Sequence, residues 1–206
     1  MFRKEEEMKK KNIQILGLCF VLTVFIVRAG IAQEAQQMDP EMMAAYMKLN
    51  APNENHAFLK NFVGEWEVTA KGWMQPGAEP ISSKGSAKAE MICGGRFLKV
   101  DFKGTMFGEP FEGIQIMGYD NYQKKNISFW IDSSSTAFYL TEGSRDEGKK
   151  RIVETGVWQD PMGGVDMNVR NTTTLVSKDE YTFEMIMILP DGTEFKSMEY
   201  RAKRKK

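Results

Sequence analysis

The chain has 206 residues, 42% of them hydrophobic, which is enough for one domain with a proper core beside a targeting segment. Its 28 basic and 28 acidic residues balance, but residues 1–32 hold six basic and three acidic ones, so residues 33–206 carry 22 against 25. A mildly acidic surface repels phosphate backbones, which argues against a nucleic-acid partner.

Residues 1–32 are predicted to be a secretory signal peptide. Three lysines at 9–11 precede an apolar run from Ile13 to Val27, and small residues follow up to Ala32. The run is shorter than the roughly 18 to 20 apolar residues that a helix needs to cross a bilayer, so cleavage is favoured over a retained anchor. We therefore expect an exported protein, periplasmic or secreted, with no stable membrane span after cleavage. Cys93 is then the one remaining cysteine, so no internal disulfide can form.

Residues 33–53 are predicted to be a short helical segment and linker. Asp39 can cap a helix and Pro40 suits its first position. Apolar side chains then recur at helical spacing, at Met42, Ala45, Tyr46 and Leu49. Such a helix could bury these side chains against the rest of the chain, cover a cavity as a lid, or bind a partner in a groove.

Residues 54–206 are predicted to form an all-β domain. Leu98, Val100 and Phe102 alternate with charged residues, and Ile127, Phe129 and Ile131 repeat this period of two. Turn sequences rich in Gly, Pro, Asp and Asn separate the runs at short intervals, and no interval could hold a crossover helix. We expect about ten antiparallel strands in meander order, forming a β-barrel.

Several of these segments resemble a bacterial family catalogued as domain of unknown function 1579. The similar blocks lie at residues 63–66, 94–98, 110–113, 118–121, 130–132 and 190–195, and the similarity runs from about Pro52 to the C-terminus. The resemblance implies a barrel similar to lipocalins and to the fatty-acid-binding and nitrobindin-like proteins. It implies no known activity.

The same resemblance assigns a structural role to Trp66. In lipocalin-like barrels a Gly-x-Trp segment closes the narrow end, with a basic side chain of the last strand over the indole. Gly64 and Trp66 match that segment, and Arg201, or Lys203, is expected over the ring.

A ligand site inside such a barrel should be mostly apolar with a few placed polar groups. An inward arginine could seat a carboxylate, and flexible methionines could repack around varied ligands. The candidate ligand-binding residues are Arg96, Tyr119, Phe102, Phe129, Arg170 and Met185. The same composition fits a completely filled core, so both a hollow and a solid barrel stay open.

The sequence presents no recognisable catalytic set and no metal site. His56 is the single histidine, which excludes sites built from several imidazoles. In the nitrobindin-like barrels that the chain resembles, haem is bound through a histidine on a barrel strand. Because His56 precedes the first strand, we expect neither haem nor another cofactor. Cys93, beside two glycines, is expected to be a small buried group. Four carboxylates lie within predicted strands, and a buried pair of them could do acid-base work: Glu112, Glu154, Asp166 and Glu184.

Three functions are consistent with these observations. The first is an exported lipocalin-like protein that binds a small hydrophobic or amphipathic ligand in the barrel. The second is an enzyme that uses carboxylates or an Arg/Tyr pair inside the barrel, which requires a polar interior cluster with a shifted carboxyl pKa. The third is a structural or partner-binding envelope protein with a filled barrel.

Overall fold

The computed structural model of the protein describes residues 39–106, 108–159 and 164–206. The predicted signal peptide lies outside these residues. Within the described ranges, helices and 3-10 turns accompany ten strands. Their bounds are α2 (Pro40–Leu49), α3 (Glu54–Leu59), η1 (Lys60–Phe62), β1 (Gly64–Gly72), β2 (Ile81–Ile92), β3 (Phe97–Met106), β4 (Glu109–Asp120), β5 (Lys125–Asp132), β6 (Tyr139–Asp146), η2 (Glu147–Lys149), β7 (Arg151–Trp158), β8 (Met167–Ser177), β9 (Glu180–Ile188) and β10 (Glu194–Arg204).

Helix α2 begins where the capping sequence predicts. The Asp39 carboxylate accepts a hydrogen bond from the Glu41 amide at 3.0 Å, and the Asp39 carbonyl accepts one from Met43 at 2.8 Å. No residue of the helix is buried, and Met42 and Met47 are more than 60% exposed. None of the helices within the described ranges is long and apolar enough to cross a membrane.

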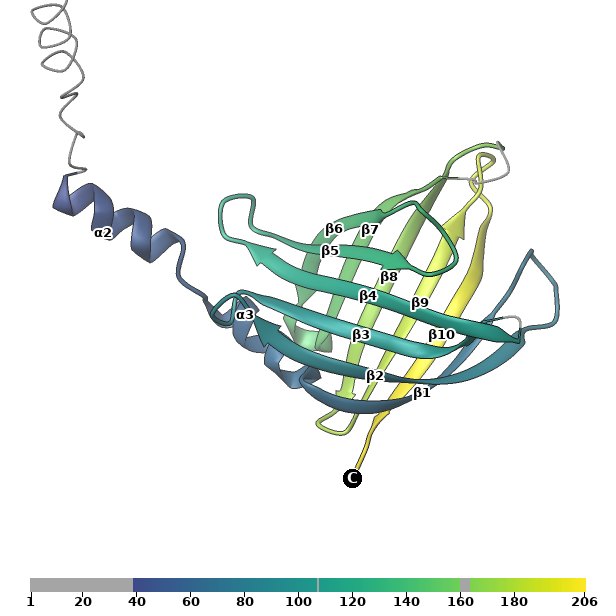
Figure 1. Cartoon of the computed structure of the whole chain (residues 1–206). Coiled ribbons are helices and arrows are strands. Elements are labelled where there is room, and N and C mark those ends of the chain that lie inside the picture. Colours follow the sequence, from purple (N-terminus) through teal and green to yellow (C-terminus); the bar gives the residue numbers. More distant parts are fainter. Residues whose placement is uncertain (1–38, 107, 160–163) are drawn as a thin grey trace, which may run out of the picture. The chain divides into compact units, whose positions relative to one another are not determined.

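The ten strands form a closed antiparallel barrel in meander order, in which β1 pairs with both β2 and β10 (Figure 1). This arrangement confirms the predicted fold class. Strands that follow one another in the chain are neighbours in the barrel, and the pairing of β1 with β10 closes the sheet. Because side chains alternate along a strand, every second residue of each strand faces the barrel axis.

Helix α3 and turn η1 plug one end of the barrel, where β1 begins. Asn53 caps α3 by accepting a hydrogen bond from the Asn55 amide at 2.9 Å, while His56 Nδ1 accepts one from the Asn53 amide at 3.0 Å. This cap turns the buried side chains of Phe58, Leu59 and Phe62 into the barrel core. Burying each of these side chains stabilises the folded protein by about 1.5 to 3 kcal/mol, so together they hold α3 and η1 in this end of the barrel.

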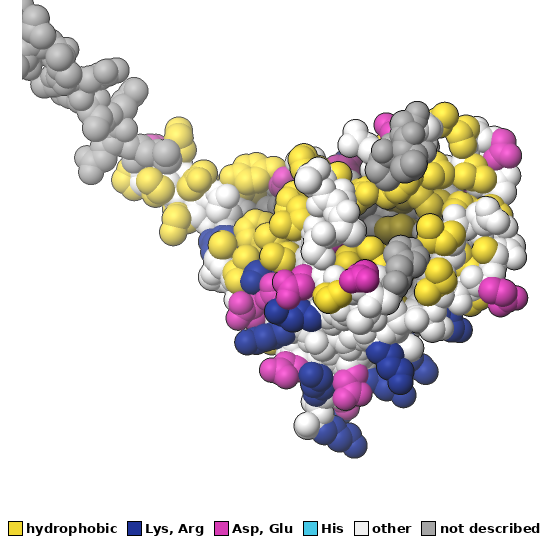
Figure 2. Space-filling view, turned by 45° about the vertical axis from the view of Figure 1, so that its right-hand side comes forward, with side chains coloured by type: hydrophobic (Ala, Val, Ile, Leu, Met, Phe, Trp, Pro, Cys, Tyr) yellow, Lys and Arg dark blue, Asp and Glu magenta, His cyan; other side chains and the backbone are white. Residues whose placement is uncertain are grey.

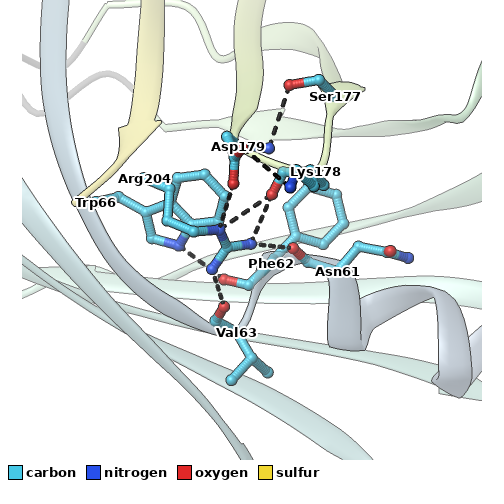
Figure 3. A network of polar contacts seen from close by, with 8 residues as sticks. All are labelled: Asn61, Phe62, Val63, Trp66, Ser177, Lys178, Asp179 and Arg204. Carbon is cyan, nitrogen blue, oxygen red and sulfur yellow. Dashed lines mark hydrogen bonds and ion pairs between the residues drawn. The ribbon is translucent and has the colours of Figure 1, made fainter. Parts of the chain in front are cut away.

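Trp66 lies at the centre of the plugged end and is fully buried. Its Nε1 donates a hydrogen bond to the Phe62 carbonyl at 2.8 Å. The Arg204 guanidinium stacks over the ring at 4.1 Å and donates to the Val63 carbonyl at 2.6 Å (Figure 3). It also donates to the carbonyls of Asn61 and Lys178, so one side chain ties the last strand to η1 and to the β8–β9 turn.

The expectation that Arg201 covers Trp66 is wrong, because Arg201 faces the other side of the sheet. Trp66 pairs with Arg204 across β1 and β10, whereas Arg201 pairs with Thr69. Arg201 lies outside the barrel and donates to Glu180 at 2.8 Å. Since faces alternate, Arg204 and Ala202 point inward and Arg201 and Lys203 point outward.

Candidate functional site

The barrel interior has a solid half and an open half. At the plugged end the inward side chains of Trp66, Leu98, Ile152 and Ala202 are at most 1% exposed. Towards the opposite end, inward side chains keep partial solvent-accessible surface, and among them are Phe102, Trp130, Met185 and Tyr200. Figure 2, in which this open end comes forward, shows hydrophobic side chains gathered around a recess. We call the space that these four side chains border the hollow.

Aromatic contacts hold the wall of the hollow. The Phe102 ring meets Trp130 at 5.4 Å and Tyr200 at 5.8 Å, both edge to face, and Phe183 stacks on Tyr200 at 4.9 Å. Trp130 lies flat over Gly113, where any larger residue would collide with the indole. Small residues behind large rings thus let the aromatic side chains lie along the wall.

Tyr200 lies in the barrel interior, among the rings of Phe102, Tyr181 and Phe183. Burial raises the pKa of its hydroxyl well above the ordinary value, and Tyr181, with which it shares a hydrogen bond, lies next to it at a ring distance of 6.0 Å. The Tyr200 side chain nevertheless keeps partial solvent-accessible surface.

A polar cluster lies on the inner wall of β5, β6, β7 and β8. Its centre is Glu154, which is 3% exposed. The Ser128 hydroxyl lies 2.8 Å from both carboxyl oxygens of Glu154, and the Thr141 hydroxyl lies 3.3 Å from one of them. Asn126 and Asn171 complete the cluster: both flank Glu154 in the sheet register, Asn171 directly and Asn126 across Gly143.

Burial sets the electrostatics of this cluster. It raises the pKa of Glu154 to about 7, against the opposing effect of the hydrogen bonds from Ser128 and Thr141. The side-chain oxygens of Asn126 and Asn171 are buried and have no hydrogen-bond partner. Buried polar groups are almost always paired, so these two acceptors need an explanation.

Gly143 makes room for the cluster. It faces inward on β6 between Asn126 and Glu154. A Cβ at this position would overlap the Val153 carbonyl and lie 2.6 Å from the Glu154 Cα. The missing side chain therefore lets Ser128 on β5 reach across β6 to Glu154 on β7.

Two of the predicted ligand-binding residues, Phe102 and Met185, line the hollow. Phe129 does not, because the inward residues of β5 are Asn126, Ser128 and Trp130. Phe129 lies on the outer surface, 5.6 Å from Phe138 and paired with Leu140. The alternation along β5 is real, but the more apolar of its two faces lies outside, so the pattern pointed to the wrong inner face.

The predicted polar anchors lie outside the hollow. Arg96 is exposed in the β2–β3 turn and donates to the Asn50 carbonyl at 3.1 Å. Arg170 faces outward on β8 and forms a bidentate pair with Glu194 at 2.9 and 2.6 Å. Tyr119 lies at the plugged end, where its ring meets His56 at 5.9 Å. The expectation of an arginine anchor inside the barrel is therefore wrong for both arginines.

His56 and Cys93, the remaining candidate residues, also lie away from the hollow: His56 belongs to the cap of α3 and Cys93 to an exposed turn. Burial lowers the pKa of His56, whose Nδ1 accepts the capping hydrogen bond. Cys93 is exposed, in contrast to the buried position expected for it, and has a φ of 50° in the turn. Within the described ranges no group of three or more His, Cys, Asp or Glu side chains is arranged to hold a metal ion.

Of the four strand carboxylates considered, Glu154 alone faces the interior. Glu112 pairs with Lys103 and Glu184 with Lys196 on the outer face, and Asp166 is exposed. The sequence around Glu154 did not indicate that this carboxylate faces inward, because β7 carries both apolar and polar residues on each face. The polar partners on β5, β6 and β8 come from segments up to 45 residues apart in the chain, and the barrel closure brings them together.

Comparisons with known proteins agree with this fold. A family model described as "Protein of unknown function (DUF1579)" matches residues 51–204. The crystal structure of Rv2717c from M. tuberculosis is similar with a TM-score of 0.57 and 11% identity, covering 76% of this chain and 100% of that one. The S-type phycobiliprotein lyase CPES from Guillardia theta is similar with a TM-score of 0.51 and 10% identity, covering 78% and 97%. No curated protein matches the sequence.

Proposed function

We propose that this chain, which belongs to the family described as "Protein of unknown function (DUF1579)", is an exported barrel that encloses a small hydrophobic or amphipathic molecule. The observation that carries the proposal is a contrast between the two ends of the barrel. The inward side chains of the plugged end are fully buried, whereas those that border the hollow keep partial solvent exposure: Phe102, Trp130, Met185 and Tyr200. A barrel filled only for stability would bury these large side chains, because each exposed apolar surface forgoes about 25 cal/mol per Å².

The wall chemistry supports the same proposal. Small-molecule sites are concave and mostly apolar, with a few polar groups that fix the orientation of the ligand. The hollow presents aromatic faces and the flexible side chain of Met185, which can adjust to ligands of different shape. The polar cluster around Glu154 lies on the same inner wall.

Dye binding with two tryptophan variants tests this proposal. N-phenyl-1-naphthylamine, a neutral aromatic dye that fluoresces in apolar surroundings, is titrated into the protein. Met185→Trp fills the hollow and should weaken dye binding at least tenfold. Ile186→Trp adds the same bulk to the outer face of the same strand and should leave dye affinity within about twofold of the original protein.

Equal dye affinity in the two variants would contradict binding inside the barrel. Native mass spectrometry of the protein from its own host, followed by organic extraction, would identify the natural ligand.

Export is the second part of the proposal and rests on the sequence of residues 1–32. Intact mass of the protein from its host, in periplasmic and culture fractions, tests it. A mass that corresponds to a chain starting at Gln33 is expected, and an unprocessed chain in the membrane fraction would refute cleavage.

A second candidate function is acid-base catalysis on the enclosed molecule. One observation favours it: the carboxyl of Glu154 is buried inside the barrel with a pKa raised to about 7, where it could both donate and accept a proton. If this function operates, Glu154→Gln should abolish turnover of the extracted compound while it still binds. Binding without turnover in the unaltered protein would exclude it for that compound.

A further inference from the structure

The polar cluster of Glu154, Ser128, Thr141, Asn126 and Asn171 offers hydrogen-bond acceptors that its own donors do not satisfy. Glu154 receives its hydrogen bonds from Ser128 and Thr141 alone among the contacts of the described residues. Asn126, which is 2% exposed, and Asn171 each hold a buried side-chain oxygen with no partner. A buried acceptor without a donor destabilises the protein, so a ligand donor that enters the cluster and binds to it is stabilised there.

Positive charge is missing from the neighbourhood of the cluster. Among the inward positions of the described strands, the basic side chains are Arg145 and Arg204. Arg145 donates to the Asn55 side chain at 3.1 Å and to Glu147 at 2.7 Å, and it stacks over Phe58 at 5.0 Å. Arg204 is held at Trp66 by three backbone carbonyls. Both arginines thus serve the plugged end, and neither is available to seat an anion in the hollow.

Asn171 connects the cluster to the hollow. It pairs with Glu154 on one side and with Met185 on the other, so it lies between the buried carboxyl and a residue that borders the hollow. Its side chain is partly exposed overall, although its oxygen is buried. A ligand that fills the hollow would therefore meet Asn171 first and Glu154 behind it.

Resting on the ligand-binding function proposed above, we propose that the enclosed molecule carries a hydrogen-bond-donor head group, a hydroxyl, amide N–H or ammonium, which binds to Asn171 and Glu154 while its apolar part lies against Phe102, Trp130 and Met185. Amphiphiles with a carboxylate head are rejected at the same site.

The rejection follows from the charges of the cluster. A carboxylate head would bring a second anion next to the Glu154 carboxyl and would present acceptors to the acceptors of Asn126 and Asn171. Burying an uncompensated charge is strongly unfavourable, and a like charge beside it in a site without water is more unfavourable still. A hydroxyl instead donates to an unpaired oxygen, and an ammonium also supplies the countercharge that an ionised Glu154 lacks.

Three decyl compounds with matched chains test the proposal at pH 8: 1-decanol, decylamine and decanoate. Their binding to the full chain is measured directly by calorimetry. We expect decanol and decylamine to bind at least tenfold more tightly than decanoate. This order requires no variant, so it does not depend on how a substitution affects folding.

Two variants assign the preference to the cluster. Glu154→Gln should weaken decylamine binding at least tenfold and decanol binding by no more than about threefold. Asn171→Leu should weaken decanol binding about tenfold, whereas Asn168→Leu, an exposed position on the outer face of the same strand, should change nothing.

The outcomes separate this proposal from the one it rests on. Decanoate binding as tightly as decanol, while Met185→Trp still blocks the dye, would overturn the donor-head proposal and leave ligand enclosure standing. Binding of none of the three compounds, with no dye binding either, would overturn both.

Discussion

Replacing Glu154 by Gln should change how the stability of this protein depends on pH. The carboxyl has an ordinary pKa of 4.5 in the unfolded chain, and burial raises its pKa to about 7 in the barrel. Below pH 4.5 both states hold the proton. Between pH 4.5 and 7 the folded protein keeps a proton that the unfolded chain has released, so the free energy of unfolding falls as the pH rises. Above about pH 7 this contribution is lost completely.

The size of the effect follows from the two pKa values. They differ by about 2.5, and each pKa unit corresponds to about 1.4 kcal/mol, so the original protein should lose about 3 kcal/mol between pH 4.5 and 8 through this group. Because Glu154 is 3% exposed, solvent screening reduces this figure little. Gln has nearly the same shape, can still accept from Ser128 and does not ionise. The variant should therefore gain about 3 kcal/mol relative to the original protein over this range.

Urea unfolding at pH 4.5, 6, 7 and 8 measures the difference. With a urea dependence of roughly 1 to 3 kcal/mol per M, the midpoint of the variant should rise by roughly 1 to 3 M relative to the original protein at pH 8. Glu112→Gln is the matched control, because that carboxylate is exposed on the outer face beside Lys103. Parallel pH curves for Glu154→Gln and the original protein, or a carboxyl titration midpoint near 4.5 by NMR, would refute the reasoning.

Three further substitutions test the rest of the fold, each by urea unfolding. Arg204→Lys should lower the free energy of unfolding by about 2 kcal/mol, because the variant loses charged hydrogen bonds and the guanidinium stacked on Trp66. Arg201→Lys, at an exposed position beside Glu180, should lower it by less than about 0.5 kcal/mol, and equal losses would contradict the inward position of Arg204. Burial lowers the pKa of His56 in the folded protein, so the free energy of unfolding should fall as the pH falls below 6.5. His56→Asn should lack this fall, and the same acid dependence in both proteins would contradict a lowered pKa for His56. Gly143→Ala should lower the free energy of unfolding by about 1 to 3 kcal/mol, because the added Cβ would overlap the Val153 carbonyl. Gly148→Ala, whose Cβ would make an ordinary contact with Asp146 at 3.7 Å, should stay within about 0.5 kcal/mol, and a neutral Gly143→Ala would contradict the predicted overlap.

The apolar residues of β3 and β5 show which structural features the period-two pattern predicts and which it does not. Leu98, Val100 and Phe102 were recognised as one face of a strand, and that face is the inner one. Ile127 and Phe129 show the same alternation, yet they lie outside while Asn126 and Ser128 lie inside. Alternation identifies a strand and its two faces, but on β5 the clearly more apolar face lies outside, so the pattern by itself does not identify the inner face.

The two arginines near the C-terminus make the same point about register. The resemblance to lipocalin-like barrels implied a basic residue of the last strand over Trp66, and a basic residue lies there. It is Arg204 and not Arg201, because the pairing of β1 with β10 places residue 204 opposite Trp66. A register shift of one residue moves every side chain to the opposite face, and nothing local in the sequence fixes that register.

The sequence by itself determined the strands, their turns and the meander order, since period-two patterns and turn residues act over a few neighbouring positions. It also determined the family. Only the tertiary structure decided that Glu154 lies inside the barrel and that Arg96 and Arg170 lie outside the hollow. Barrel closure fixes the register of all ten described strands together, and that single constraint places Glu154 among Ser128, Thr141 and Asn171.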